Sequence, residues 1–254
     1  MQKQRGHSVF DPAEFRAYLA ERLGKPESEI AVPEDLVFTY HPRIFRAAVT
    51  QSTAKPVDWY IYRDRMYIGT LVDRQVGIAH AMIGAPAAAM NPEELISYGA
   101  RRVYELGFAG AIDPVLEPGD IVVLKGAFSD EGTSKHYFRG GTWFGSSRNL
   151  TRRLEKSLRE GGMKYTLGDA WTTDAPYRET REKVARYRRM GARVVNMESS
   201  AFFAVSKYRR VEATSVQIVS DVVSEEKWYP GFHREKVNER GKDALSAVLR
   251  TIKG

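Results

Sequence analysis

Residues 106–123, LGFAGAIDPVLEPGDIVV, begin at the end of one short apolar run and extend into a second. A segment rich in glycine and proline joins the two runs. Arg102 to Leu106 and Ile121 to Leu124 are both expected to be strands, because each run is bounded by turn residues. On both sides of this stretch, similar runs alternate with amphipathic segments. This alternation predicts parallel strands joined by helical crossovers, and therefore an α/β fold with helices on both faces of a mixed central β-sheet.

The other elements follow from the same patterns. Toward the N-terminus, strands are expected at 36–40, 59–62, 66–71 and 76–82, and helices at 45–49 and 91–99. Toward the C-terminus, helices at 150–160, 179–190, 199–208 and 235–252 are expected to alternate with strands at 165–172, 193–197 and 213–219. The runs 59–62 and 66–71 flank Arg63-Asp64-Arg65 and predict a hairpin.

The first helix has clear boundary signals. Asp11 is placed to cap it, Pro12 suits its first position, Glu14 completes a capping box, and Gly24 marks its end. Residues 1–35 are therefore expected to form a helical extension of one domain that covers residues 1–254.

Composition narrows the class of protein. Hydrophobic residues make up 43% of the 254, and no apolar run approaches the roughly 18 residues of a membrane helix. The first residues, MQKQRGHSVFDPAEF, lack the apolar core of a secretory signal, and the absence of cysteine excludes disulfides and a cysteine nucleophile. The expected location is cytoplasmic, with no membrane partner.

Charge and histidine spacing exclude two further classes of function. Lysines and arginines number 39 against 32 acidic residues, a net charge of +7, but they are dispersed among glutamates, as in RETREKVARYRR. No nucleic-acid partner is therefore expected. The five histidines show no closely spaced ligand pattern, so no metal site is expected.

The segments after the expected strands carry most of the polar residues that could do chemistry. In α/β sheets, ligands bind beyond the carboxyl ends of the strands. A glycine there lets a ligand approach the backbone, and a carboxylate can accept hydrogen bonds from ligand hydroxyls, although each residue alone could also be a helix cap or a turn. The segments are 83–86, 107–110, 130–134, 172–174, 197–199 and 220–221.

Taken together, these segments resemble the nucleoside phosphorylase-I superfamily, and most closely its archaeal-type, uridine phosphorylase-like branch. The matching residues are IGAPAAAMNPEEL at 83–95, the stretch at 106–123, DEGTSKHYF at 130–138, WTTDAPYRETREKVARYRRMGA at 171–192, VVNMESSAFFAV at 194–205 and IVSD at 218–221. The resemblance implies phosphate-dependent cleavage of a ribonucleoside to free base and ribose 1-phosphate, with no cofactor and with phosphate as co-substrate. It also implies a homo-oligomer in which dimers assemble into a hexamer.

The resemblance assigns roles to particular residues. Met197 would pack on the sugar, and Glu198 would bind the 2′-hydroxyl and stabilise the positive charge that develops on the ribose. Asp221, beside Ser220, would protonate or bond N7 of a purine, because a purine leaves poorly as an anion. Asp221 and Glu198 are thus the expected catalytic residues. Substrate would also contact Ser220, Phe108, Ala109, Gly110, Tyr177 and, from a neighbouring subunit, His7.

The phosphate site departs from the family pattern. Where relatives place an arginine and a threonine, this chain has Glu105 and Phe108, and the family loop Gly-Asp-Pro-x-Arg is reduced to Tyr40-His41-Pro42-Arg43. A carboxylate repels a dianion and phenylalanine offers it no hydrogen bond. Arg43, Arg46 and, across a dimer interface, Arg63 or Arg65 are the alternative cations that could gather phosphate.

Three functions therefore stay open, with phosphorolysis favoured. In the second, Glu105 activates water and the enzyme is a nucleoside hydrolase. In the third, the chain binds nucleosides without turnover. If Glu105 and Phe108 do form the phosphate pocket, the exchange Glu105→Arg with Phe108→Thr is expected to strengthen phosphate dependence. Asp221 favours a purine over uracil as the base.

Overall fold

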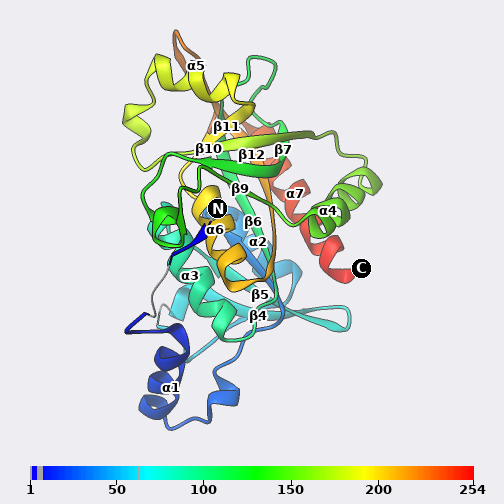
Figure 1. Ribbon diagram of the computed structural model, residues 1–254. Helices are drawn as coiled ribbons and strands as arrows, with labels where there is room; N and C mark the ends of the chain where they lie inside the picture. Colours follow the sequence, from blue (N-terminus) through cyan, green and yellow to red (C-terminus); the bar gives the residue numbers. More distant parts are fainter. Residues whose placement is uncertain (1, 5–7, 62) are drawn as a thin grey trace.

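The computed structural model describes residues 2–4, 8–61 and 63–254 and shows a mixed central sheet with helices on both faces (Figure 1). The expected α/β class is confirmed. The helices are α1 (Pro12–Leu23), α2 (Pro42–Gln51), α3 (Ala85–Ser97), α4 (Arg148–Glu160), α5 (Arg181–Arg189), α6 (Ser199–Arg209) and α7 (Glu235–Lys253). Short 3-10 turns are η1 (Glu27–Glu29), η2 (Arg63–Arg65), η3 (Thr133–His136) and η4 (Pro176–Arg178).

The strands form one large sheet and one small pair within the described residues. They are β1 (Gln2–Lys3), β2 (Asp35–Thr39), β3 (Lys55–Pro56), β4 (Met66–Leu71), β5 (Arg74–His80), β6 (Arg102–Ala111), β7 (Ile121–Ser129), β8 (Phe138–Arg139), β9 (Trp143–Gly145), β10 (Thr166–Thr172), β11 (Ala192–Asn196), β12 (Glu212–Val223) and β13 (Trp228–Pro230). The order in the large sheet is β13-β12-β7-β10-β11-β6-β2-β5-β4-β3, with β9 on β7. β1 pairs with β8.

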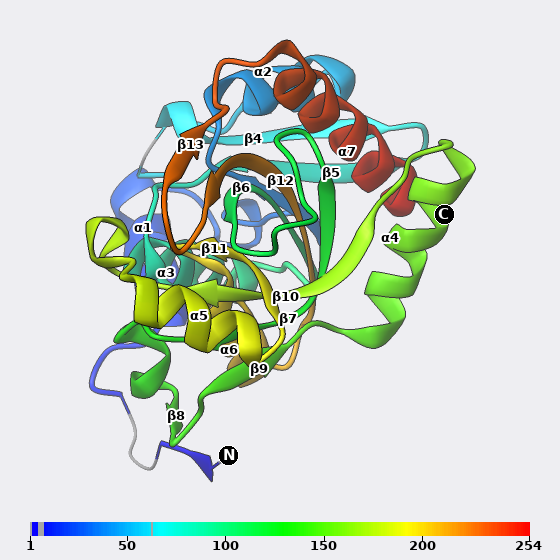
Figure 2. The same ribbon diagram turned by 90° about the horizontal axis from the view of Figure 1, so that it is seen from above.

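Part of the large sheet closes on itself. β12 pairs with β7 on one side and with β6 on the other, so β6, β12, β7, β10 and β11 form a ring (Figure 2). The strands run parallel at β6–β12, β7–β10 and β10–β11, but antiparallel at β11–β6. The ring brings the ends of β11 and β12 to the same strand, β6.

Helices cover the two faces of the sheet with separate apolar cores. Phe38, Tyr98 and Phe202 lie in the core on the side of α1, α3 and α6, whereas Tyr104 and Leu245 lie in the core shared with α2, α4 and α7. All five side chains are at most 1% exposed. Burial of a large apolar side chain stabilises the fold by about 1.5–3 kcal/mol. Successive side chains of β6 point to opposite faces of the sheet, so alternate residues of this strand are buried in the two cores.

The N-terminal helix forms as its boundary signals predicted. The Asp11 side chain accepts a hydrogen bond from the backbone of Ala13, Glu14 completes the capping box, and Gly24 ends α1 at φ +63°. No helix among the described residues is both long and apolar enough to cross a membrane.

Two expectations about strands are wrong. β4 pairs with β5 through a turn at Val72. The expected hairpin with residues 59–62 is not formed by residues 59–61, which are not in a strand and where Trp59 packs on Tyr98, and residue 62 lies outside the described residues. In addition, β6 continues to Ala111, so residues 107–110 belong to a strand rather than to a loop. A Cβ on Gly107 would lie 2.6 Å from Oε1 of Gln217, so this glycine serves close packing inside the sheet.

Candidate active site

The carboxyl-terminal half of β6 is flanked by the ends of two other strands. Gly110 of β6 lies opposite Val195 of β11 and also opposite Asp221 of β12. A Cβ on Gly110 would lie 3.3 Å both from Oδ2 of Asp221 and from Cγ1 of Val195. Glu198 lies two residues after the end of β11, and its pKa responds to the charge of Glu105 on β6. The structure therefore brings the two expected catalytic carboxylates to the same strand, although they are 23 residues apart in the sequence.

Glu198 is buried and held by backbone donors. Its Oε1 accepts the N–H of Gly84 at 2.9 Å, and its Oε2 accepts the N–H of Met197 at 3.0 Å. Gly84 precedes α3 at φ +105°, a conformation that favours glycine and that aims its N–H at the carboxylate. Burial, opposed by these two bonds and supported by the charge of Glu105, raises the pKa of Glu198 to about 7.

Asp221 owes its position to a bulge in β12. The register with β6 shifts between Val219 and Asp221, which leaves Ser220 as the extra residue. The Ser220 hydroxyl donates to Oδ1 of Asp221 at 2.7 Å, and the indole N–H of Trp228 donates to Oδ2 at 2.8 Å. Glu179 lies close by: burial, followed by the charge of Asp221, raises the pKa of Glu179 to about 7.

Glu105 is enclosed rather than open to a ligand. It is 0% exposed; its Oε1 accepts the hydroxyl of Tyr40 at 2.9 Å, and its Oε2 accepts Ser199 Oγ at 2.5 Å and Gln217 Nε2 at 3.2 Å. Burial nevertheless raises its pKa, against the effect of these donors. The expectation that Glu105 lines a phosphate pocket therefore does not fit this chain.

Ser199 also links Glu105 to the start of α6. The Ser199 hydroxyl accepts the amide N–H of Asn196 at 2.6 Å, and the other end of that amide accepts the hydroxyl of Thr172 at 3.0 Å. Because Glu198 immediately precedes Ser199, this buried network fixes the turn that carries the Glu198 carboxylate.

Basic residues gather instead at the N-terminus of α2. His41 caps this helix and packs its ring 4.8 Å from that of Phe108, while His80 stacks on Phe45 at 4.9 Å. Burial, then Arg43, Arg46 and His80, lowers the pKa of His41. Burial, then Arg65, lowers the pKa of His80, opposed by a hydrogen bond to Tyr40, and Arg46 lowers it further. We call His41, Arg43, Arg46, Arg65 and His80 the basic cluster.

The cations of this cluster differ in how firmly they are held. Arg43 reaches Oδ1 of Asn238 at 3.4 Å and Arg65 reaches the backbone oxygen of His80 at 3.5 Å. In the described ranges, the exposed guanidinium of Arg46 has no hydrogen-bond partner. The N-terminal end of a helix also favours negative charge.

Other expected site residues lie apart or outside what can be described. Tyr177, on η4, is 99% exposed, so within a single chain it does not line an enclosed site. His7 lies outside the described residues, as does the side chain of Arg63. Phe108 faces the core of α2 and α7, whereas Glu105 bonds to Ser199 on the α6 side, so these two do not form one pocket. Ala109 lies with its backbone oxygen 3.3 Å from the Ser220 hydroxyl.

The sequence did not predict the contacts that two residues make with the carboxylates of the site. Tyr40 donates to Glu105, and Trp228 donates to Asp221. The only sequence signal for Trp228 is the aromatic group Trp228-Tyr229 and Phe232 soon after Asp221. Within the described residues, no group of three or more histidines and carboxylates could hold a metal ion.

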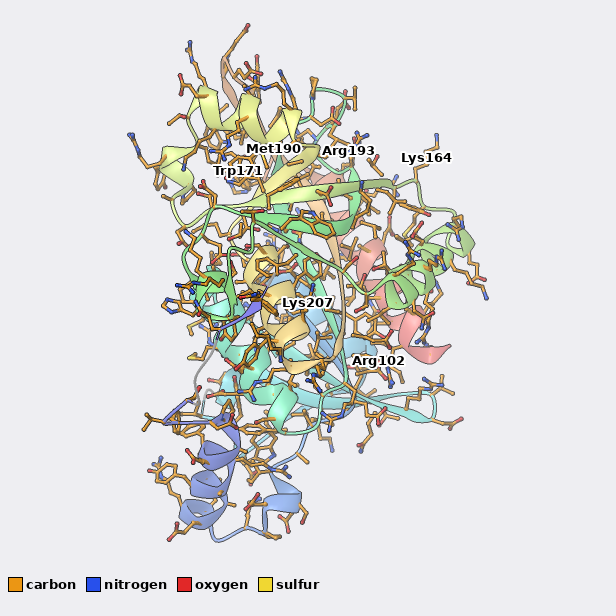
Figure 3. The ribbon with its side chains drawn as sticks, viewed as in Figure 1. Arg102, Lys164, Trp171, Met190, Arg193 and Lys207 are labelled. Atoms are coloured by element: carbon orange, nitrogen blue, oxygen red, sulfur yellow. The ribbon has the colours of Figure 1, made fainter. Side chains whose placement is uncertain are left out.

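Arg102 and Arg193 serve structure outside this site (Figure 3). Arg102, at the start of β6, pairs with Asp35 and Glu34 rather than with Glu105, and Arg193 pairs with Asp113.

Comparisons with known proteins give the family and the fold of this chain. The model of the phosphorylase superfamily matches residues 45–253. A DeoD-type purine nucleoside phosphorylase of Bacillus cereus is 26% identical over 187 residues, which are 72% of this chain and 80% of the relative. Two solved structures share the fold. Purine nucleoside phosphorylase of Toxoplasma gondii, bound to immucillin-H, has a TM-score of 0.78, 19% identity and coverage of 88% and 91%. Uridine phosphorylase of Vibrio fischeri has a TM-score of 0.75, 24% identity and coverage of 89% and 94%.

Proposed function

Because the chain belongs to the phosphorylase superfamily, as its sequence motifs indicated, we propose that it is a nucleoside phosphorylase, a pentosyltransferase that needs no cofactor. Its reaction is the phosphate-dependent cleavage of a ribonucleoside to free base and ribose 1-phosphate. The observation that carries the proposal is the pair of buried carboxylates, Glu198 and Asp221, on either side of β6. Relatives named purine and uridine nucleoside phosphorylases support it.

The two carboxylates suit the two halves of an N-glycosidic bond. As the bond breaks, the ribose gains positive charge, and an ionised Glu198 next to it stabilises that charge and accepts the 2′-hydroxyl. The base gains negative charge, and Asp221 supplies a proton to N7. Met197 packs on the sugar. Since an acid at N7 serves purines, the base is a purine.

The co-substrate is phosphate, bound by the basic cluster. Arg46 is exposed and lies close enough to His41 and His80 to lower the pKa of both. A dianion there would be stabilised by Arg43, by Arg46 and by the N-terminus of α2. Glu105 is a poor base for the alternative, hydrolysis, because three donors already occupy its two oxygens.

A phosphate titration tests this function. With inosine or adenosine, turnover should require inorganic phosphate and yield ribose 1-phosphate, and Arg46→Gln should raise the KM for phosphate about tenfold with little change in the KM for nucleoside. Arg152→Gln, a change on the distant helix α4, is the matched control. Release of free ribose without phosphate would establish hydrolysis instead, and nucleoside binding without turnover would establish the silent homologue.

The acid side of the pH profile should report on Glu198. Since its pKa is raised to about 7 and the ionised form stabilises the sugar cation, kcat should rise with pH through about 7. Glu105→Gln removes one cause of that shift, so the midpoint should move to lower pH. The raised pKa also means that Glu198 stabilises the folded state at low pH and that this contribution is lost as pH rises from 4.5 through about 7. An unmoved midpoint in Glu105→Gln would contradict the coupling of the two carboxylates.

We also propose that the active form is a homo-oligomer of dimers, as the family resemblance implies. Apolar side chains on the surface of the single chain support it: Ile61 is 50% exposed and Ile83, beside Gly84, is 68% exposed. His7 and Arg63 are the residues expected to reach the site of a neighbouring copy.

A further inference from the structure

Directly after Asp221 the chain turns back and runs beside its own path. We call residues 222–231 the strap. It begins with the last residues of β12 and returns as β13, which pairs antiparallel with β12 (Figure 2). Val223 then lies opposite Trp228, and Asp221 lies opposite Pro230. Gly231 fixes the far end, since a Cβ there would lie 2.6 Å from the backbone oxygen of Ser220. The strap thus holds Trp228 over the Ser220-Asp221 pair.

Trp228 is placed by its polar end rather than by burial. Its side chain is 54% exposed and its ring lies 6.1 Å from that of Phe232, itself 48% exposed. Its indole N–H, in contrast, points inward and donates to Oδ2 of Asp221, a residue that is only 7% exposed. A half-exposed tryptophan contributes little to the core, so packing alone does not explain this side chain.

Each oxygen of the Asp221 carboxyl group has its own hydrogen-bond donor. An ionised carboxylate only accepts hydrogen bonds, and both oxygens of Asp221 receive one, from Ser220 and from Trp228. Donors of this kind stabilise the carboxylate relative to the acid.

We propose that Trp228 is a positioning residue for the leaving-group acid, a role that rests on the proposed function. In the reaction, the C1′–N9 bond breaks and its electron pair moves to the base, the proton of the Asp221 carboxyl moves to N7, and a phosphate oxygen forms the new bond to C1′. Asp221 is left as a carboxylate, and the N–H of Trp228 and the O–H of Ser220 stabilise that product. Trp228 thereby holds the Asp221 carboxyl in place while its proton moves to the departing purine.

The test compares two leaving groups. A purine ribonucleoside methylated at N7 carries a positive charge and departs as a neutral base without protonation, so it does not need the acid. Trp228→Phe keeps an aromatic ring but removes the N–H. It should lower kcat about tenfold for inosine, in line with loss of one hydrogen bond to a charged group, and leave kcat for 7-methylinosine unchanged.

Matched variants separate this role from a structural one. Trp143→Phe removes another indole–carboxylate hydrogen bond, the one that Trp143 of β9 donates to Asp169 of β10 at 3.3 Å. This variant should leave the ratio of the two kcat values unaltered. Ser220→Ala removes the other donor to Asp221 and should reproduce the selective loss on inosine, which keeps the proposal testable if Trp228→Phe folds poorly. An equal fall on both nucleosides in both variants, or no fall in either, would overturn the proposal. If the wild-type protein cleaves neither nucleoside, the proposed function itself fails.

Discussion

Glu198→Gln is expected to lower kcat by about two orders of magnitude or more, because a neutral amide cannot stabilise the positive charge that develops on the ribose. A hundredfold loss corresponds to about 2.7 kcal/mol of transition-state stabilisation. The amide has nearly the shape of the carboxylate, so substrate still fits. Its single oxygen, however, can accept only one of the two backbone N–H groups, from Gly84 and Met197, that the carboxylate now accepts.

The lost acceptor gives this variant a stability cost that has to be separated from the catalytic one. A buried donor without a partner costs about 1–3 kcal/mol, so the melting temperature should fall as well. Glu131→Gln is the matched control: Glu131 is 0% exposed, against 6% for Glu198, and it accepts the hydroxyls of Ser129 and Ser200 and the backbone N–H of Ser134 in a closed cluster of serines. That variant should lose comparable stability and less than tenfold in kcat. If Glu198→Gln turned over at the wild-type rate, Glu198 would be no more than the residue that precedes α6.

The helices and most strands could be predicted because their signals are local. The capping box at Asp11 and Glu14 and the apolar periods of α4, α6 and α7 each lie within a few residues. The hairpin partner of β4 was expected at 59–62, but β4 forms its hairpin with β5 and pairs with β3 on its other edge. The choice depends on a turn at Val72, whose positive φ of 57° is rare for a β-branched residue.

The same division holds for the site. The family resemblance named Glu198 and Asp221, and their catalytic roles stay predictions. In the structure Asp221 lies opposite Gly110 of β6, and Glu198 lies shortly after β11, whose Val195 is also opposite Gly110. Trp228 and Tyr40 act on these carboxylates only through the return of the strap and the pairing of β2 with β6. Such contacts depend on tertiary packing, which no spacing along the chain encodes.

Glu105 is where sequence and structure lead to different expectations. From the sequence, Glu105→Arg with Phe108→Thr should strengthen phosphate dependence. In the structure, position 105 is 0% exposed and surrounded by donors from Tyr40, Ser199 and Gln217. The Gln217 side chain also packs closely on Gly107 of β6, so β12 leaves no room for a longer side chain at position 105.

We therefore expect Glu105→Arg, alone or with Phe108→Thr, to destabilise the protein rather than to create a phosphate site. A guanidinium has five donors and no acceptor, so it would face three donors in a buried space; such an uncompensated charge costs about 3–5 kcal/mol. Chemical denaturation of the single and double variants measures this loss.

Glu105→Gln should keep most of the stability, because its amide oxygen can accept Ser199 and Gln217 while the Tyr40 hydroxyl turns to accept its N–H. Phe108 packs on His41 of the basic cluster, and we expect the Phe108→Thr variant to fold. An arginine variant with wild-type stability and a lower KM for phosphate would mean that position 105 opens toward the anion, and that the basic cluster is not the place where phosphate binds.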